Sequence, residues 1–373
     1  MASLRDYSLR HMNATFAPSS APRLFNGDRS TELGYEVYGQ YYEYQWRLFS
    51  GHNTTTCRPT QNPENTFRLV HHLHNGKARE ELKELLKSTI SSATDEECER
   101  SMDLAARLLT MLWIGVPKDQ VMARRCLRWE QGTIRDFVSD FFKEAPKLSY
   151  ERVRLPKSFN AWSISKIAGI NISFTDNLAD HLLLTDDDST LLIFHHVSFL
   201  ECHLQPNSTI VTPLYPAGLI HETLSTIALL FPQSEFALAT RRSRSRQKSW
   251  WLRNVRLAHE QSGQHPTALD PRLALCGTLQ AHDRQIERFH FWRDRLVILK
   301  QTYDDATPSS LKQWWHDRRN GVQWYTFWVA VLVLLTTTVL SLLQTVAAFL
   351  QVYQAYVTTA EVRGAVCPQG KSA

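Results

Sequence analysis

Two clusters of histidines hold the side chains of this sequence that are best suited to metal chemistry. They are His71, His72 and His74, and His195, His196, Cys202 and His203. Alternation along a strand would place His72 and His74 on one face. One turn of helix would bring His196 towards Cys202 and His203, whose imidazole and thiolate groups are typical zinc ligands. The spacing matches no zinc-site pattern, so we expect packed or surface histidines and keep His196, Cys202 and His203 as zinc candidates.

The sequence lacks the short motifs that are typical of common enzyme classes. It contains no GxxxxGK[ST] loop, no GxGxxG, no GxSxG and no HExxH. The acidic run at 186–188 lacks the Gly and the distant Glu of a calcium loop, so we expect a solvated turn there. The six cysteines form no CxxC pair, which indicates reduced and mostly buried thiols. We therefore predict no catalytic residue, no bound metal and no cofactor.

A stripe of small and polar residues recurs along an apolar stretch near the C-terminus. Its members are Thr337, Ser341, Gln344, Ala348 and Gln351. Steps of 4, 3, 4 and 3 place them on one face of a helix. Because an unpaired amide in hydrocarbon is costly, we expect this polar stripe to pair with another copy of the helix. The alternative is that Gln344 bonds back to its own helix.

The stretch that carries the polar stripe is suited to cross a membrane. No charged residue occurs between Arg319 and Glu361, and a helix over Val329 to Leu350 would be about 33 Å long, close to the hydrocarbon thickness of a bilayer. Aromatic side chains that favour headgroup zones flank it. These interface residues are Trp314, Trp315, Trp324, Tyr325, Trp328, Tyr353 and Tyr356. We predict a single transmembrane helix that contacts the lipid bilayer.

The charges beside this helix predict its orientation. More basic residues precede it than follow it, which places the N-terminal part in the cytosol by the positive-inside rule. The N-terminus lacks the apolar run of a secretory signal, and only a short tail follows the span, so we expect a tail-anchored protein. Four glycosylation sequons would matter only in the opposite topology. The sequence does not indicate which membrane is used.

A basic segment at 239–256 surrounds two tryptophans. Its first cations are Arg241, Arg242, Arg244, Arg246 and Lys248. We interpret the segment as a flexible loop, and anionic lipid is the contact that we expect first of the functional ones. A phosphorylated switch, a nucleic-acid patch and a solvated loop are the alternatives. The net charge of +5, with acidic residues interspersed, argues against a mainly nucleic-acid-binding protein.

These segments belong to a chain of 373 residues that we divide into five parts. The expected parts are a loose arm (1–33), an α+β domain (34–277), a long helix with an interfacial linker (278–320), the membrane helix with its flanks (321–356) and a short tail (357–373). The expected fold class is α+β, mainly α: a helical cytosolic domain with a small sheet, and a long helix leading into one C-terminal transmembrane helix. Length and composition allow a proper core.

Hydrophobic periodicity predicts the elements of this domain. We expect helices over 80–90, 94–114, 133–143, 217–231 and 278–303. The second is opened by a capping box, Thr94 with Glu97. Short apolar runs at 170–174 and 191–195 predict strands. The aromatic run at 35–49 is expected to dock on the core, and the apolar face of 278–303 either packs on the domain or pairs with another chain.

Several runs resemble a large family of uncharacterised fungal single-pass membrane proteins. The runs lie at 155–200, 221–233 and above all 284–335, which begins RQIERFHFWRDRLVILKQ and includes QWWHDRRNGVQWYTFW. The resemblance implies a fungal source and one C-terminal span, and it implies no known activity. A long helix that leads into a membrane helix also resembles CorA-type magnesium channels. The sequence departs from that family because it lacks the Gly-Met-Asn signature and a second membrane helix.

The sequence therefore supports three hypotheses of function. The first is a non-enzymatic, tail-anchored interaction or scaffold protein, with a cytosolic domain that binds a protein partner and a membrane helix that forms homo-oligomers. The alternative is an oligomeric transport or channel component with the polar stripe lining a path. The third is a membrane-bound enzyme, which would require a concave pocket that gathers titratable groups.

Overall fold

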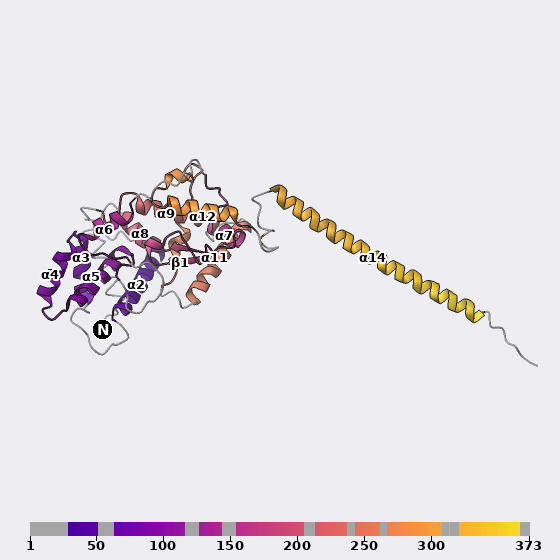
Figure 1. The fold of residues 1–373 in the computed structure, drawn as a ribbon, viewed down its shortest axis with the longest axis horizontal. Helices are drawn as coiled ribbons and strands as arrows, with labels where there is room; N and C mark the ends of the chain where they lie inside the picture. Colours follow the sequence, from indigo (N-terminus) through magenta and orange to yellow (C-terminus); the bar gives the residue numbers. More distant parts are fainter. Residues whose placement is uncertain are drawn as a thin grey trace, which may run out of the picture. The chain divides into compact units, whose positions relative to one another are not determined.

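The computed structural model describes most of the chain. The described residues are 29–50, 63–115, 127–143, 154–204, 213–236, 243–261, 267–307, 313 and 321–365. The chain divides into two compact units: residues 1–307, which we call the body, and residues 308–373, which hold the C-terminal helix. The body is mainly helical with one small sheet, which confirms the predicted fold class (Figure 1).

Among the described residues, four helices belong to the N-terminal part of the body. They are α2 (Arg29–Ser50), α3 (Pro63–His74), α4 (Arg79–Thr89) and α5 (Asp95–Thr110). Helix α5 opens with the predicted capping box: the Thr94 hydroxyl accepts from the Glu97 amide, and the Glu97 carboxylate accepts from the Thr94 amide. It ends at Met111, which adopts a left-handed conformation. A local sequence signal thus determines where α5 begins.

Helix α2 docks its aromatic face on α5, as predicted. The hydroxyl of Tyr38 donates to the carbonyl of Leu108 at 2.7 Å, and the hydroxyl of Tyr41 donates to the carbonyl of Arg107 at 3.2 Å. Both rings are buried. The helix already begins at Arg29, so residues 29–33 are not part of a loose arm; residues 1–28 lie outside the described residues.

The small sheet has three strands in the order β1-β3-β2. They are β1 (Asn171–Thr175), β2 (Leu183–Thr185) and β3 (Thr190–Phe194). Strands β1 and β3 are parallel, and β2 is antiparallel to β3. A 3₁₀ helix, η2 (Leu178–Asp180), separates β1 from β2, and residues 186–188 form the predicted acidic turn. Both apolar runs predicted as strands are therefore strands.

Short helices complete the core of the body, and one of them, α7, contacts β1. They are α6 (Ile134–Phe141), α7 (Ala161–Ile167), α8 (Val197–Leu204), α9 (Leu219–Leu230) and α10 (Gln233–Phe236). Helix α9 ends before Pro232, which cannot continue a helix. Buried side chains from α2 to the last helix of the body form one continuous hydrophobic cluster.

Two predictions about the second half of the body were wrong. The basic segment expected as a loop is largely the helix α11 (Ser243–Gln261), which buries Trp251 and Leu252. The long helix expected over 278–303 is also absent: 3₁₀ turns η3 (Pro271–Ala274) and η4 (Ile286–Arg288) precede a shorter helix, α12 (Arg293–Asp305).

The start of α12 is set by a residue of another helix. The carboxylate of Glu222, on α9, accepts from the amides of His290 and Trp292 at 2.8 and 2.7 Å. These amides would otherwise donate within a continuous helix. The apolar face that includes Trp292 and Tyr303 is buried in the body. Residues 278–307 therefore belong to the body and pack on it.

The second unit is dominated by one long helix, α14 (Gly321–Ala365). Its stretch Trp324–Ala360 is long and apolar enough to cross a membrane, and the most apolar part of this stretch is not buried. The helix continues past residue 356, so residues 357–365 of the expected tail are helical.

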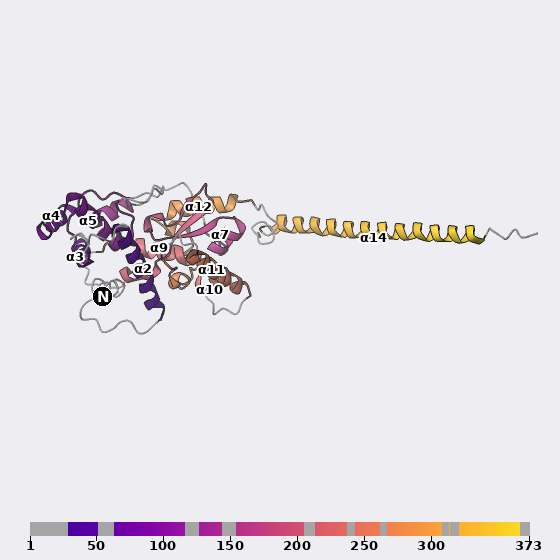
Figure 2. The ribbon, with the colours of Figure 1, turned by 90° about the horizontal axis from the view of Figure 1, so that it is seen from below.

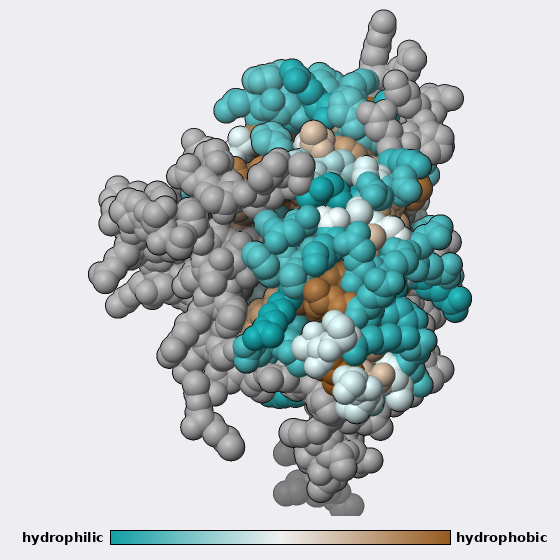
Figure 3. All heavy atoms as spheres, turned by 90° about the vertical axis from the view of Figure 1, so that its left-hand side faces the viewer, coloured by the Kyte–Doolittle hydropathy of each residue, from teal (hydrophilic) through white to brown (hydrophobic). Residues whose placement is uncertain are grey.

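One face of the body is covered mainly by hydrophilic residues. Figure 3 views the molecule from the side on which α4 lies in Figure 1, and most of the coloured surface there is hydrophilic, with a small hydrophobic patch near its centre. In both Figures 1 and 2, α7, α11 and α12 lie at the other end of the body from α4.

Candidate functional site

The densest group of titratable side chains lies at the carboxyl ends of two parallel strands. Asp176 follows β1 directly, and His195 and His196 follow β3 directly. Because β1 and β3 are parallel neighbours, their carboxyl ends meet at the same edge of the sheet. The three side chains therefore converge although 19 to 20 residues separate them. We call this group the Asp–His centre.

One carboxylate oxygen organises the Asp–His centre. Oδ1 of Asp176 accepts from Nε2 of His195 at 3.1 Å, from Nε2 of His196 at 2.6 Å and from the hydroxyl of Thr267 at 2.7 Å. Burial opposes ionisation of Asp176, but the hydrogen bonds from the two histidines hold the pKa of its carboxyl well below the usual value. An ionised Asp176 at neutral pH is therefore the acceptor that this centre requires.

The hydrogen bonds also define the tautomer of His195. Its Nδ1 accepts from the backbone amide of Asp270 at 3.4 Å, so the proton resides on Nε2, which donates to Asp176. Burial and the neighbouring His196 lower the pKa of His195. His195 is thus a neutral ring held between a carboxylate and a backbone amide.

The ligand atoms of Asp176, His195 and His196 all lie within 4.8 Å of one another, the closeness that a metal ion needs. A metal, however, binds an imidazole nitrogen that carries no proton. Nε2 of His195 carries a proton in this arrangement, because Nδ1 is the acceptor. The residues present therefore fit a hydrogen-bonded centre better than a metal site.

The zinc candidates from the sequence do not assemble. Cys202 and His203 form no ligand group with His196. Nδ1 of His203 instead donates to the carbonyl of Phe199 at 3.0 Å, and burial lowers the pKa of His203 to about 4. The sequence analysis missed Asp176, and the signal that could have found it is its position directly after a strand that pairs in parallel with β3.

The Asp–His centre is closed to solvent. His195 is 0% exposed, His196 1% and Asp176 8%. The edge of the Tyr41 ring packs on His196, with ring centroids 5.8 Å apart. The centre thus joins the two strand ends, α2 and the segment of Thr267, and its geometry supports a positioning role inside the fold.

Another buried histidine, His181, connects the sheet to α9. Nδ1 of His181 accepts from the amide of Phe194 at 3.2 Å, so its Nε2 donates to the hydroxyl of Thr226 at 2.7 Å. The Thr226 hydroxyl donates onward to the carbonyl of Thr223. Burial, with a smaller contribution from Arg295, lowers the pKa of His181 to about 3. This ring is neutral at physiological pH.

The first histidine cluster is helical and not a strand. His71, His72 and His74 lie in the last turn of α3. Nε2 of His71 bonds the side chain of Asn75, and burial lowers the pKa values of His72 and His74. These residues form no group of potential metal ligands among the described residues.

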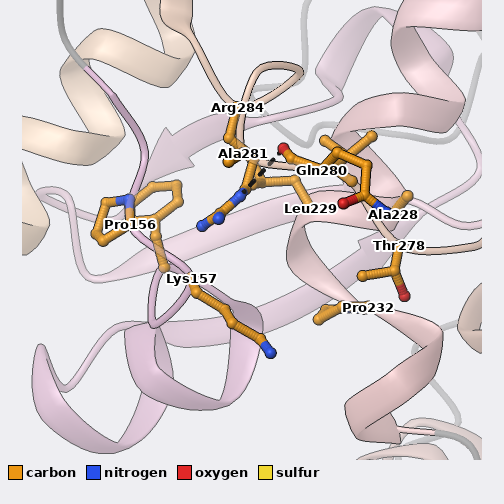
Figure 4. A pocket seen from close by; sticks show the side chains of 11 residues that line it. Pro156, Lys157, Ala228, Leu229, Pro232, Thr278, Gln280, Ala281 and Arg284 are labelled. Atoms are coloured by element: carbon orange, nitrogen blue, oxygen red, sulfur yellow. Dashed lines mark hydrogen bonds between the residues drawn. The ribbon is translucent and has the colours of Figure 1, made fainter.

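A pocket of about 340 Å³ opens beside α9 (Figure 4). It is lined by Pro156, Lys157, Phe159, Ala228, Leu229, Pro232, Thr278, Leu279, Gln280, Ala281 and Arg284. Lys157 and Arg284 are its ionisable side chains, and no carboxylate, histidine or thiol is among the lining residues. The Arg284 guanidinium donates to the carbonyls of Gln280 and Leu155. The pocket thus offers cations and apolar walls, without an acid–base pair for catalysis.

The polar stripe lies on α14 as predicted. All five of its residues are exposed in the single chain. The hydroxyl of Thr337 donates back to the carbonyl of Leu334 at 2.9 Å. The side-chain amide of Gln344, in contrast, has no hydrogen-bond partner within the described part of the chain.

The described interface residues lie near the two ends of the apolar stretch. Trp324, Tyr325 and Trp328 lie in the first turns of α14, and Tyr353 and Tyr356 lie on it beyond Leu350. From Trp328 to Tyr353 the helix rises by about 38 Å, which suits the two headgroup zones of one bilayer. Trp314 and Trp315 lie outside the described residues.

The basic residues of 239–256 fall into separate groups. Arg241 and Arg242 lie outside the described residues, and Arg244 lies in the first turn of α11. The ammonium of Lys248 pairs with the Glu235 carboxylate and lies 5.5 Å from the ring centroid of Trp162. Lys248 is therefore bound to the body and is not available to lipid, whereas Arg246 is exposed.

The chain matches no protein-family model, no curated protein and no solved structure.

Proposed function

We propose that this protein is a single-pass membrane protein that acts as an interaction scaffold. In this proposal α14 crosses the bilayer once and pairs with a second copy through the polar stripe. The body remains in the cytosol and presents its surface to a protein partner.

The observation that carries the proposal is the contrast between α14 and the body. The most apolar part of Trp324–Ala360 is not buried within the protein, and the whole stretch has no acidic or basic residue, so water would be a poor environment for its apolar surface. A helix satisfies all its backbone hydrogen bonds internally, which hydrocarbon requires. This combination supports a membrane anchor.

The body supports binding more than catalysis. Its Asp–His centre is buried and its hydrogen bonds are made within the chain. The pocket beside α9 has no carboxylate, histidine or thiol among its lining residues, so it does not pair a general acid with a general base. Both features favour a body that presents a stable surface for binding over a body that carries out catalysis.

The charges around the helix support the cytosolic position of the body. Lys312, Arg318 and Arg319 precede α14, whereas Arg363 and Lys371 follow the apolar stretch. The excess of basic residues on the N-terminal side favours the cytosol on that side.

Alkaline carbonate extraction of membranes that contain the full chain tests the anchor. The wild-type chain is expected to remain in the membrane pellet. The double substitution Val339→Lys and Leu343→Lys places two charges at the centre of the span, at a cost of about 3 kcal/mol each, and should release the chain.

The matched control is Thr358→Lys with Thr359→Lys. It adds the same two charges beyond Tyr356, at the end of the span, so the chain should stay in the pellet. Release of the wild-type chain into the supernatant would overturn the proposed anchor.

A further inference from the structure

Helix α11 has one exposed face that combines basic and apolar side chains. The face consists of Arg246, Trp250, Arg253 and Leu257, at steps of 4, 3 and 4. Trp250 is 65% exposed and Leu257 is 43% exposed, while both arginines are exposed as well. Residues at this spacing share one side of a helix. We call them the α11 face.

The opposite side of α11 holds the helix on the body. Trp251 and Leu252 are each 7% exposed, and the Trp251 ring packs edge to face on Phe236. The Ser249 hydroxyl donates to the carbonyl of Phe236 at 2.7 Å, and His259 donates to the carbonyl of Thr267 at 2.9 Å. The two adjacent tryptophans therefore lie on different sides of α11: Trp251 packs on the body, and Trp250 is exposed.

We infer that the α11 face rests on the anionic leaflet of the membrane that α14 crosses. Arginine attracts acidic headgroups, and tryptophan prefers the headgroup zone because its ring is apolar and its N–H is polar. An exposed Trp and Leu between two arginines match such a surface in both respects. The inference rests on the proposed membrane anchor and adds a second contact to it.

The position of α11 in the body agrees with this contact. Helix α11 packs on α7, which carries the exposed Lys166. In Figures 1 and 2, α7, α11 and α12 lie at one end of the body, and the described chain leaves the body after α12 at Thr307. The hydrophilic α4 side lies at the other end.

The connection between the body and α14 is short. Residues 308–320 separate the body from α14. Fourteen steps along an extended chain reach at most about 50 Å, so the leaflet is present at a high effective concentration. The acidic residue nearest to the face along α11 is Glu260, one turn after Leu257, and the two arginines outweigh it.

Photocrosslinking of the full chain in nanodiscs tests the inference. The discs contain phosphatidylcholine alone or with phosphatidylserine that carries a photoreactive headgroup, and peptide mass spectrometry locates the crosslinks. The wild-type chain should crosslink to phosphatidylserine within residues 246–257. Arg246→Gln with Arg253→Gln should lower these crosslinks about twentyfold, and Trp250→Ala should lower them severalfold.

The matched control is Arg47→Gln with Arg68→Gln. These arginines are exposed on α2 and α3, with side chains that are 79% and 63% exposed. The control removes the same charge and should leave the crosslinks at 246–257 unchanged. Circular dichroism of all variants verifies that they fold.

Co-elution with the discs separates this inference from the proposed anchor. A chain that co-elutes but gives no crosslinks at 246–257, or gives equal crosslinks after both double substitutions, overturns the α11 contact and leaves the anchor intact. A chain that does not co-elute overturns both.

Discussion

Nε2 of His196 lies 2.6 Å from Oδ1 of Asp176, and this hydrogen bond joins the ends of two parallel strands. The same oxygen accepts from His195 and from Thr267, which is 91 residues away in the chain. One buried carboxylate thus connects the sheet to the segment that follows α11. The stability of the body should depend strongly on it.

Asp176→Ala should lower the free energy of unfolding of the body by about 3–5 kcal/mol, because three buried donors lose their acceptor. Asp176→Asn keeps a neutral acceptor and should cost less, about 1–3 kcal/mol. Urea unfolding of the full chain in detergent micelles, followed by tryptophan fluorescence, measures both.

Asp140→Asn is the control for these two variants. Asp140 is 68% exposed and pairs with Lys143 on the surface, so its loss should change stability by less than about 0.5 kcal/mol. Equal effects of Asp176→Ala and Asp140→Asn would show that the Asp–His centre does not stabilise the body.

The buried His181 should make the body less stable in acid. Its pKa is about 3 in the folded chain, against about 6.5 when unfolded. Below pH 6.5 the unfolded chain therefore binds a proton that the folded chain does not, and stability falls as pH falls. The stability that the neutral His181 contributes is fully present above pH 6.5 and is lost progressively as the pH falls to 3.

His181→Asn removes this titration while its Oδ1 still accepts from the amide of Phe194. Between pH 6.5 and 5 the wild-type chain should lose about 1–2 kcal/mol more than the variant. The comparison uses urea unfolding at both pH values. Identical pH dependences would contradict the neutral, buried state of His181.

The polar stripe predicts how α14 associates. Gln344→Leu should weaken the homo-oligomer severalfold, because one interhelical amide bond contributes about 1 kcal/mol in a membrane. Ala348→Leu should also weaken it, since a larger side chain separates the helices. Sedimentation in detergent micelles measures the change in oligomer size.

Gln354→Leu serves as the control, because it removes an amide from another face of the same helix. An unchanged oligomer after Gln344→Leu would end the pairing hypothesis. If Gln344→Cys reacted quickly with a membrane-impermeant thiol reagent, water would lie beside the stripe, and the transport alternative would replace the scaffold.

The sequence predicted the elements whose signals are local. The capping box at Thr94 placed the start of α5, and the apolar runs around Phe174 and Ile193 placed β1 and β3. Pro232 likewise placed the end of α9. In each case the residues that determine the element lie within or beside it.

The wrong predictions concern elements whose start or conformation depends on residues that are far away in the sequence. Glu222, on another helix, accepts from the amides of His290 and Trp292 just before α12, and no residue near Arg293 in the sequence predicts this start. The serines and arginines of 243–249 led us to predict a loop. Burial of Trp251 stabilises a helix there instead. The Asp–His centre depends on the parallel pairing of β1 and β3, which hydrophobic patterns do not reveal.

The most direct test of the membrane-anchored scaffold is protease protection of the full chain in intact microsomes, with a tag at each end. The protease should digest the N-terminal tag and the body, while the C-terminal tag should be protected. The sequons at Asn13, Asn53, Asn171 and Asn207 should then carry no glycan. A protected body with a digested C-terminal tag would place the body in the lumen and contradict the cytosolic scaffold.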